Sequence, residues 1–223
     1  MIRLFFSILQ REFLISLRSG ADSLTVFFFF LSFMALSSFF LQSLSWIGFE
    51  LPLVLGWVLC LSTYFLSIER YYSRDLDDGT YEFYFSLSTP FSFFLFMKGF
   101  SHWIFHGIPL SLASFFLFLF YSIPTQLVFF LPFTFFMGTF LLSQISTLGF
   151  CLTSKLKYRG ALLSFLLLPL SFPIIILCIM SVFSFLNGTP FLSFFQIYLG
   201  ALLFVSILTS FFSSYILLSS FQT

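Results

Sequence analysis

The densest run of charge in this 223-residue chain lies between residues 69 and 82, in the segment ERYYSRDLDDGTYE. It holds seven of the 17 Asp, Glu, Lys and Arg residues of the chain, and its tyrosines are of the amphipathic kind that interfaces favour. A short charged helix, begun by Asp and ended by Gly, can seat in a groove of a soluble partner. We therefore expect a docking element here. The alternative is a solvated hinge whose charges only keep it out of the bilayer.

Calcium does not fit this segment, although Asp75 and Asp77 have the alternating spacing of a calcium loop. An EF-hand needs glycine at its sixth position and glutamate at its twelfth. Counted from Asp75, those positions hold Thr80 and Ser86. Calcium is therefore rejected for this segment, and we assign no metal ligand in it.

His102 and His106 form a second candidate site, because residues four apart share one face of a helix. Two imidazoles on one face could bind a metal or contact haem. The alternative is that they are ordinary interfacial residues beside Lys98 and Trp103, since polar and aromatic side chains gather at membrane surfaces. Neither histidine is followed by a carboxylate that would orient its ring.

Two prolines, Pro169 and Pro173, interrupt a long apolar run. Each removes a backbone donor, which favours a helix kink that could line a pathway, although kinks also arise from packing alone. The three cysteines, Cys60, Cys151 and Cys178, lie in apolar runs without metal or haem-attachment spacing, so we expect buried, inert thiols.

The composition excludes a water-soluble protein. Hydrophobic residues make up 60% of the chain and charged residues 8%, whereas soluble domains carry about 25% charged residues. A net charge of +1 gives no basic surplus for nucleic acid. No phosphate-binding loop is present, so we expect no ATP hydrolysis and no catalysis by this chain. The start of the chain lacks the pattern of a removable signal peptide.

Apolar runs of about 20 residues, enough to cross the hydrocarbon, predict six transmembrane helices. Residues 24–45 and 51–68 form the first two, separated by a turn at residues 46–52. Residues 99–154 contain two more, joined near residues 122–125, and residues 160–223 contain the last two, with a turn near residues 187–190. The predicted fold is therefore an all-α integral membrane protein, a single transmembrane domain over residues 1–223. No span has Asp, Glu, Lys or Arg at its middle, which argues against a proton-pumping subunit.

All nine Lys and Arg residues fall on one side of these spans. The positive-inside rule then puts both termini and the charged loop over residues 69–98 in the cytoplasm or the mitochondrial matrix. An amphipathic pattern over residues 1–18 predicts an interfacial helix within residues 1–22.

Six spans, a basic amphipathic start and a charged inner loop without a phosphate loop resemble the membrane subunit of an ABC-2 type transporter. The local motifs are similar to those of the CcmB family, the haem exporter B permeases of the cytochrome c maturation system. They are Glu69-Arg70, Asp75-x-x-Asp78-Gly79-x-x-Glu82, Pro90, Lys98, His102-Trp103, Gly107-x-Pro109-Leu110 and Leu168-Pro169-Leu170-x-x-Pro173. The resemblance spans nearly the whole chain.

The resemblance implies partners: a separate CcmA-like ATPase subunit on the inner face, a haem-handling membrane subunit, a haem chaperone and a second copy of this chain. ATP would be hydrolysed on the partner, and haem would be cargo assigned mainly to the partner subunits. The residues that this family comparison makes candidates for ATPase coupling are Glu69, Arg70, Arg74, Asp75, Asp77, Asp78, Gly79 and Glu82, while His102, Trp103 and His106 are candidates for haem or interface contact.

Two other functions fit the composition. One is a structural or assembly subunit of a respiratory complex, and the other is an ABC-2 permease for a different cargo. The 42 phenylalanines indicate strong AT bias in the coding sequence, as in organellar genomes. We therefore expect the mitochondrial inner membrane, with the bacterial inner membrane as the alternative.

Overall fold

A computed structural model of the chain describes residues 2–18, 21–42, 48–86, 90–121, 123–156 and 159–221. Within these ranges the regular structure is entirely helical. Six segments are long and apolar enough to cross a membrane: Leu24–Leu41, Glu50–Asp77, Phe91–Phe120, Phe130–Thr153, Leu162–Leu186 and Phe191–Leu217. The prediction of an all-helical membrane protein with six spans is confirmed.

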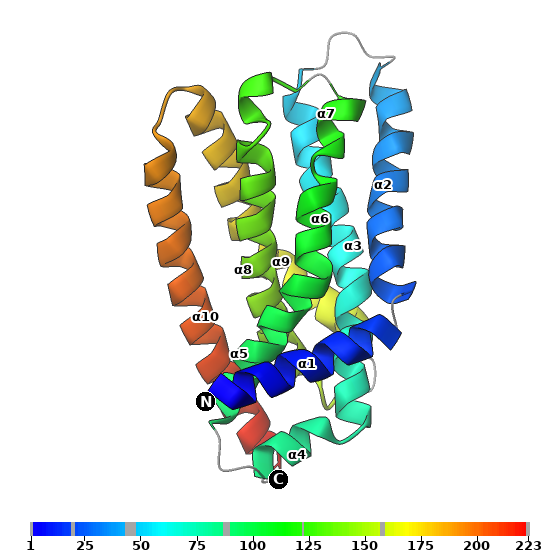
Figure 1. Cartoon of the computed structure of the whole chain (residues 1–223), viewed down its shortest axis with the longest axis vertical. Helices are drawn as coiled ribbons and strands as arrows, with labels where there is room; N and C mark the ends of the chain where they lie inside the picture. The colour runs from blue at the N-terminus through cyan, green and yellow to red at the C-terminus, as the bar shows by residue number, and fades with distance from the viewer. Residues whose placement is uncertain are drawn as a thin grey trace.

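The spans run side by side as an elongated bundle (Figure 1). Five of them are single helices: α2 (Ala21–Gln42), α3 (Glu50–Asp77), α8 (Phe130–Thr153), α9 (Arg159–Leu186) and α10 (Phe191–Phe221). The third span, Phe91–Phe120, consists of several shorter helices. Helix α1 (Ile2–Arg18) lies across the spans near one end, as the amphipathic pattern predicts, and the short α4 (Thr80–Ser86) lies at that same end. The start of α1 and the end of α10 share this end, which we call the charged end.

The predicted boundaries are wrong around the charged loop. Helix α3 continues to Asp77, α4 follows after a two-residue turn, and the third span begins at Phe91, so most of residues 69–98 is helical rather than loop. The reason is that Asp75 and Lys98 neutralise each other, which lets both enter the bundle. The predicted interfacial helix within residues 1–22 is also shorter than expected: α1 ends at Arg18, and α2 begins at Ala21.

The predicted turns near residues 122–125 and 187–190 are confirmed in their described parts. Helix α7 (Phe116–Phe120) ends before the first of these turns, and the short 3-10 helix η2 (Thr125–Leu127) begins at the last residue of that turn. Ser122 lies outside the described residues. Gly188 turns the chain between α9 and α10 with φ +90°, a left-handed conformation that suits glycine. The turn predicted at residues 46–52, between α2 and α3, is described only in part, because residues 43–47 lie outside the described ranges.

The third span is not one regular helix, which the sequence analysis does not predict. It consists of α5 (Phe91–His102), a π-helical turn η1 (Trp103–Gly107), α6 (Ile108–Ala113) and α7. A π turn holds one extra residue and changes the direction of the side chains that follow it. Here it lies directly after His102 and includes His106.

The core is centred on α8, which packs extensively against α9 and α10. Trp57 of α3 stacks on Phe135 of α8, with ring centroids 4.2 Å apart. A Cβ at Gly138 would lie 2.5 Å from the Trp57 ring and 2.7 Å from Cys178 Sγ, so only glycine lets these three helices approach so closely. Cys60, Cys151 and Cys178 are all buried and free, as the sequence predicts.

Candidate functional site

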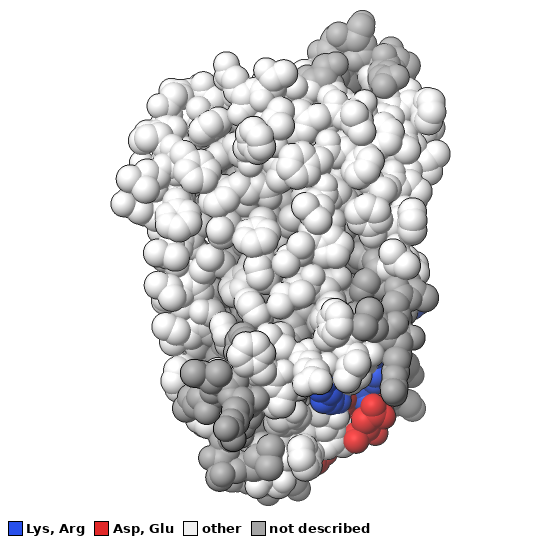
Figure 2. All heavy atoms as spheres, in the orientation of Figure 1, with Lys and Arg blue, Asp and Glu red and all other residues white. Residues whose placement is uncertain are grey.

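Charged atoms are visible only near the charged end on the face shown in Figure 2. The turn between α3 and α4 forms part of this end. Asp78 N–H donates to the carbonyl of Arg74 (3.0 Å), Gly79 N–H donates to that of Leu76 (3.2 Å), and Gly79 has φ +69°. A left-handed glycine at this position ends a helix and satisfies its last carbonyls, so α3 stops here and α4 can begin at once.

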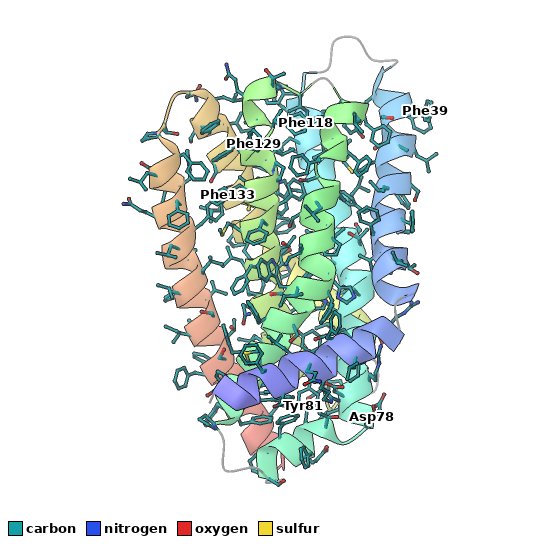
Figure 3. All side chains as sticks on the ribbon, in the orientation of Figure 1. Phe39, Asp78, Tyr81, Phe118, Phe129 and Phe133 are labelled. Carbon is teal, nitrogen blue, oxygen red and sulfur yellow. The ribbon has the colours of Figure 1, made fainter. Side chains whose placement is uncertain are left out.

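Helix α4 has one buried and one exposed face. Tyr81 is fully buried, and Tyr84 is nearly so and stacks on Phe94 of α5 at 4.1 Å. Burial raises the pKa of both tyrosine hydroxyls, so they stay neutral. Phe83 and Phe85 are 59% and 40% exposed. Tyr81 lies at the charged end below α1, with Asp78 at its outer edge (Figure 3). The tyrosines anchor α4, and the rings of Phe83 and Phe85 lie on its exposed face.

Above α4, a buried ion cluster joins three helices. The Lys98 ammonium of α5 donates to both carboxylate oxygens of Glu12 in α1, at 3.0 Å each, and to Asp75 Oδ2 of α3. Each of these three residues is 1% exposed. The Tyr71 hydroxyl donates to Glu12 Oε2 at 2.9 Å, and its ring lies 4.1 Å below the Lys98 ammonium. This ring position gives a cation–π contact in addition to the hydrogen bonds.

Arg11 of α1 completes the cluster. Its guanidinium donates to Asp75 Oδ1 (2.9 Å) and Oδ2 (3.2 Å), to Glu12 Oε1 (2.8 Å) and to Thr80 Oγ1 at the start of α4 (3.0 Å). Burial alone would lower the pKa of Arg11, but the hydrogen bonds and charge of Asp75 outweigh that effect and raise it above its ordinary value. Arg11 therefore stays charged.

The cluster is electrically balanced, with the cations Arg11 and Lys98 facing the anions Glu12 and Asp75. Charges removed from water are tolerated only when they are paired and hydrogen-bonded. The sequence analysis did not single out Glu12, and it assigned Lys98 to a loop. Two signals were available: Glu12 is the single acidic residue of α1, and Lys98 precedes 56 residues without Asp, Glu, Lys or Arg.

The structure separates the residues proposed for coupling. Asp75 is buried inside the ion cluster, whereas Asp77, Asp78 and Glu82 are exposed around the turn and α4. Glu69 and Arg70 are exposed further up α3, and Arg74 and Gly79 are half-buried. The Glu69 carboxylate lies against Gly160, in the first turn of α9, where backbone N–H groups favour an anion. The residues therefore do not form one continuous surface.

His102 and His106 do lie together, with ring centroids 4.8 Å apart, but inside the bundle. Their exposed fractions are 0% and 5%. His102 Nε2 is 3.1 Å from Ser67 Oγ, and the rings of Tyr64, Tyr71 and Tyr72 surround it at 4.8–5.5 Å. Contact between haem and the His102 ring would require these tyrosines to move apart.

The remaining candidates have packing positions. Trp103 donates from Nε1 to the carbonyl of Phe136 at 3.2 Å and packs on α8. Pro169 and Pro173 lie on the exposed surface of α9, which remains one helix from Arg159 to Leu186. Neither proline faces the interior of this chain.

Comparison with known proteins adds a family to this geometry. The family described as CcmB protein matches residues 3–218. Heme exporter protein B of Haemophilus influenzae is 29% identical over 173 residues, which is 78% of each chain. The protein of the same name from Pseudomonas aeruginosa is 31% identical over 136 residues, or 61% of each, and that of Escherichia coli K12 is 43% identical over 120 residues, or 54% of each.

Proposed function

This chain belongs to the CcmB protein family, and from that premise we propose that it is the permease subunit of an ABC transporter for haem export in cytochrome c maturation. The match over residues 3–218 carries the proposal, because it covers all six spans and the charged end together. The chain contributes the membrane path and the coupling surface. A separate ATPase subunit hydrolyses ATP, and the cycle delivers haem and releases its chaperone outside.

The ATPase subunit docks, in this proposal, on the outer face of the α3–α4 turn. Three exposed carboxylates, Asp77, Asp78 and Glu82, flank the exposed rings of Phe83 and Phe85. Aromatic anchors with a charged rim suit a groove that is apolar at its floor and basic at its edge. Asp75 is excluded from direct contact by its burial, so its role is to hold the turn in place.

The orientation of the chain follows from its cations. With all nine Lys and Arg residues on one side of the six spans, the positive-inside rule puts the charged end in the compartment that supplies ATP. Bacterial relatives support a bacterial-type inner membrane, and the phenylalanine-rich composition supports the mitochondrial inner membrane. Fractionation of the source cells, followed by detection of the chain in purified organelles, tests the second location.

Further partners belong to the same proposal. We assign haem ligation to a separate haem-handling membrane subunit, since both histidines of this chain are enclosed. Two copies of the chain would pair with two ATPase subunits. In the most apolar stretches of α2 and α10, only 22% and 11% of residues are buried within one copy, so these two spans leave apolar surface that lipid or a second copy would cover.

The test is double charge reversal, Asp78→Lys with Glu82→Lys, in the full transporter complex. We expect the ATPase subunit to be lost on purification through this chain, and covalent haem attachment to c-type cytochromes to fall. Glu50→Lys is the matched control, because Glu50 is an exposed carboxylate at the opposite end of α3. If the double variant retains the ATPase and the cytochromes as well as the control does, the docking proposal is wrong.

A further inference from the structure

Helix α1 is joined to the charged end by the ion cluster as well as by apolar packing, in which Ile8 lies in the core and Leu9 packs against it. Among its described side chains, Phe6, Phe13 and Leu14 are 64%, 51% and 50% exposed. Ile8 and Glu12 are buried, and of these only Glu12 forms hydrogen bonds to other helices. An outward apolar surface suits the membrane interface. The hydrogen bonds of the ion cluster are therefore the polar connections that tie the described part of α1 to α3 and α5.

Arg11 is the member of the cluster that reaches α4. A guanidinium is a rigid planar fork with five N–H donors, so it can hold several oxygens in a fixed arrangement. Here the fork binds both oxygens of Asp75 at the end of α3 and the hydroxyl of Thr80 at the start of α4. These two contacts lie on either side of the turn at Asp78 and Gly79. Arg11 therefore joins the two helices across the turn that connects them.

Lys98 connects the same cluster to the third span. Its ammonium binds the carboxylates of α1 and α3, and four residues later His102 ends α5, where the π turn begins. A displacement of α1 or α3 that kept these hydrogen bonds would carry α5 with it. The cluster thus connects α4 to a span that has an irregular turn within its length.

We propose that Arg11 and Glu12 are positioning residues of a charge-balanced latch, which locks α1 onto α3 and α5 and holds α4 in one orientation for its partner. The latch has four charges of zero sum, and removal of one of them leaves an unbalanced charge inside the protein. The docking role of α4 within this inference rests on the proposed function. The latch itself does not.

The test measures the position of α4 relative to α1 in the full chain in lipid nanodiscs. Spin labels are placed at Gln10 of α1 and Ser86 of α4, which are both exposed, after replacement of the three buried cysteines by alanine. Pulsed electron spin resonance gives the distribution of the distance between them. The unaltered latch should give one narrow peak. Arg11→Gln should broaden that peak, because the hydrogen bonds from α1 to both Asp75 and Thr80 are removed.

Two further variants guard against misfolding and non-specific effects. Arg11→Gln combined with Asp75→Asn removes one charge of each sign and leaves the Lys98–Glu12 pair neutral, so it should fold and still lose the narrow peak. Leu14→Ala is the control on the exposed side of α1 and should keep it. A narrow peak that survives in both Arg11 variants overturns the latch.

Purification of the transporter complex through each of these variants of the chain tests the latch and the docking proposal separately. We expect both Arg11 variants to lose the ATPase subunit while Leu14→Ala keeps it. If the peak broadens but the ATPase stays, and Asp78→Lys with Glu82→Lys releases it, the latch does not position α4 for docking and that part is overturned. If the double reversal also retains the ATPase, the docking proposal is wrong, and the latch is then tested by the distances between the spin labels alone.

Discussion

Replacement of Lys98 by methionine is the most direct perturbation of the buried cluster. Methionine fills a similar volume but cannot donate, so three charge-assisted hydrogen bonds are lost: two to Glu12 and one to Asp75. Glu12, Asp75 and Arg11 then leave a net charge of minus one inside the protein. Removal of one partner from a buried ion pair costs about 3–5 kcal/mol. We expect the lower end of that range, because Arg11 still binds both carboxylates.

A cost of about 3 kcal/mol corresponds to an increase of about 100-fold in the unfolding equilibrium constant, since about 1.4 kcal/mol is a factor of ten. The measurement is unfolding of the purified chain in mixed micelles with increasing SDS, followed by tryptophan fluorescence. Lys155→Met is the matched control, because Lys155 is an exposed lysine and surface ion pairs contribute about 0–1 kcal/mol.

The double variant Glu12→Gln with Lys98→Met provides the decisive comparison. It removes one charge of each sign and leaves Arg11 paired with Asp75, so it should be more stable than Lys98→Met alone. Replacement of a whole buried ion pair by groups of similar volume is often nearly neutral. The reasoning would be refuted if Lys98→Met cost no more than Lys155→Met, or if the double variant were as unstable as the sum of its single variants.

Three other predictions follow from close packing, backbone conformation and burial. Gly138→Val should destabilise the bundle by about 1–3 kcal/mol through overpacking against Trp57 and Cys178, measured as a lower midpoint in the same SDS titration. Gly79→Ala and Gly188→Ala both place a side chain at positive φ, so each should lower the free energy of unfolding by about 1–2 kcal/mol. Only Gly79→Ala should weaken retention of the ATPase subunit. Equal retention in the two variants would contradict the assignment of docking to the α3–α4 turn. The three native thiols should react slowly with a maleimide in intact membranes and quickly after SDS unfolding, and rapid labelling of folded protein would contradict their burial.

The acidic segment between residues 69 and 82 illustrates how the structure refines a functional prediction. Its charge density indicates a polar, partner-facing element, and Asp77, Asp78 and Glu82 are indeed exposed. Asp75, in the same run and of the same residue type, is buried and bound to Lys98. The burial of Asp75 depends on the cations that other helices bring close, since Lys98 and Arg11 both bind its carboxylate.

The sequence by itself determined the six spans, their approximate turns and the side on which the cations gather. These features are local, since a run of about 20 residues without charge can enter hydrocarbon whatever its neighbours are. Only the tertiary structure decided which charged residues enter the bundle. Arg11 and Glu12 lie 64 and 86 positions from the residues they bind, Asp75 and Lys98. Glu12, Asp75 and Lys98 can be buried only because folding brings them together with the half-buried Arg11 in a cluster of zero net charge. Neutralisation by distant partners lets α3 continue to Asp77 and α5 begin at Phe91, beyond the span boundaries that a count of isolated charges predicts.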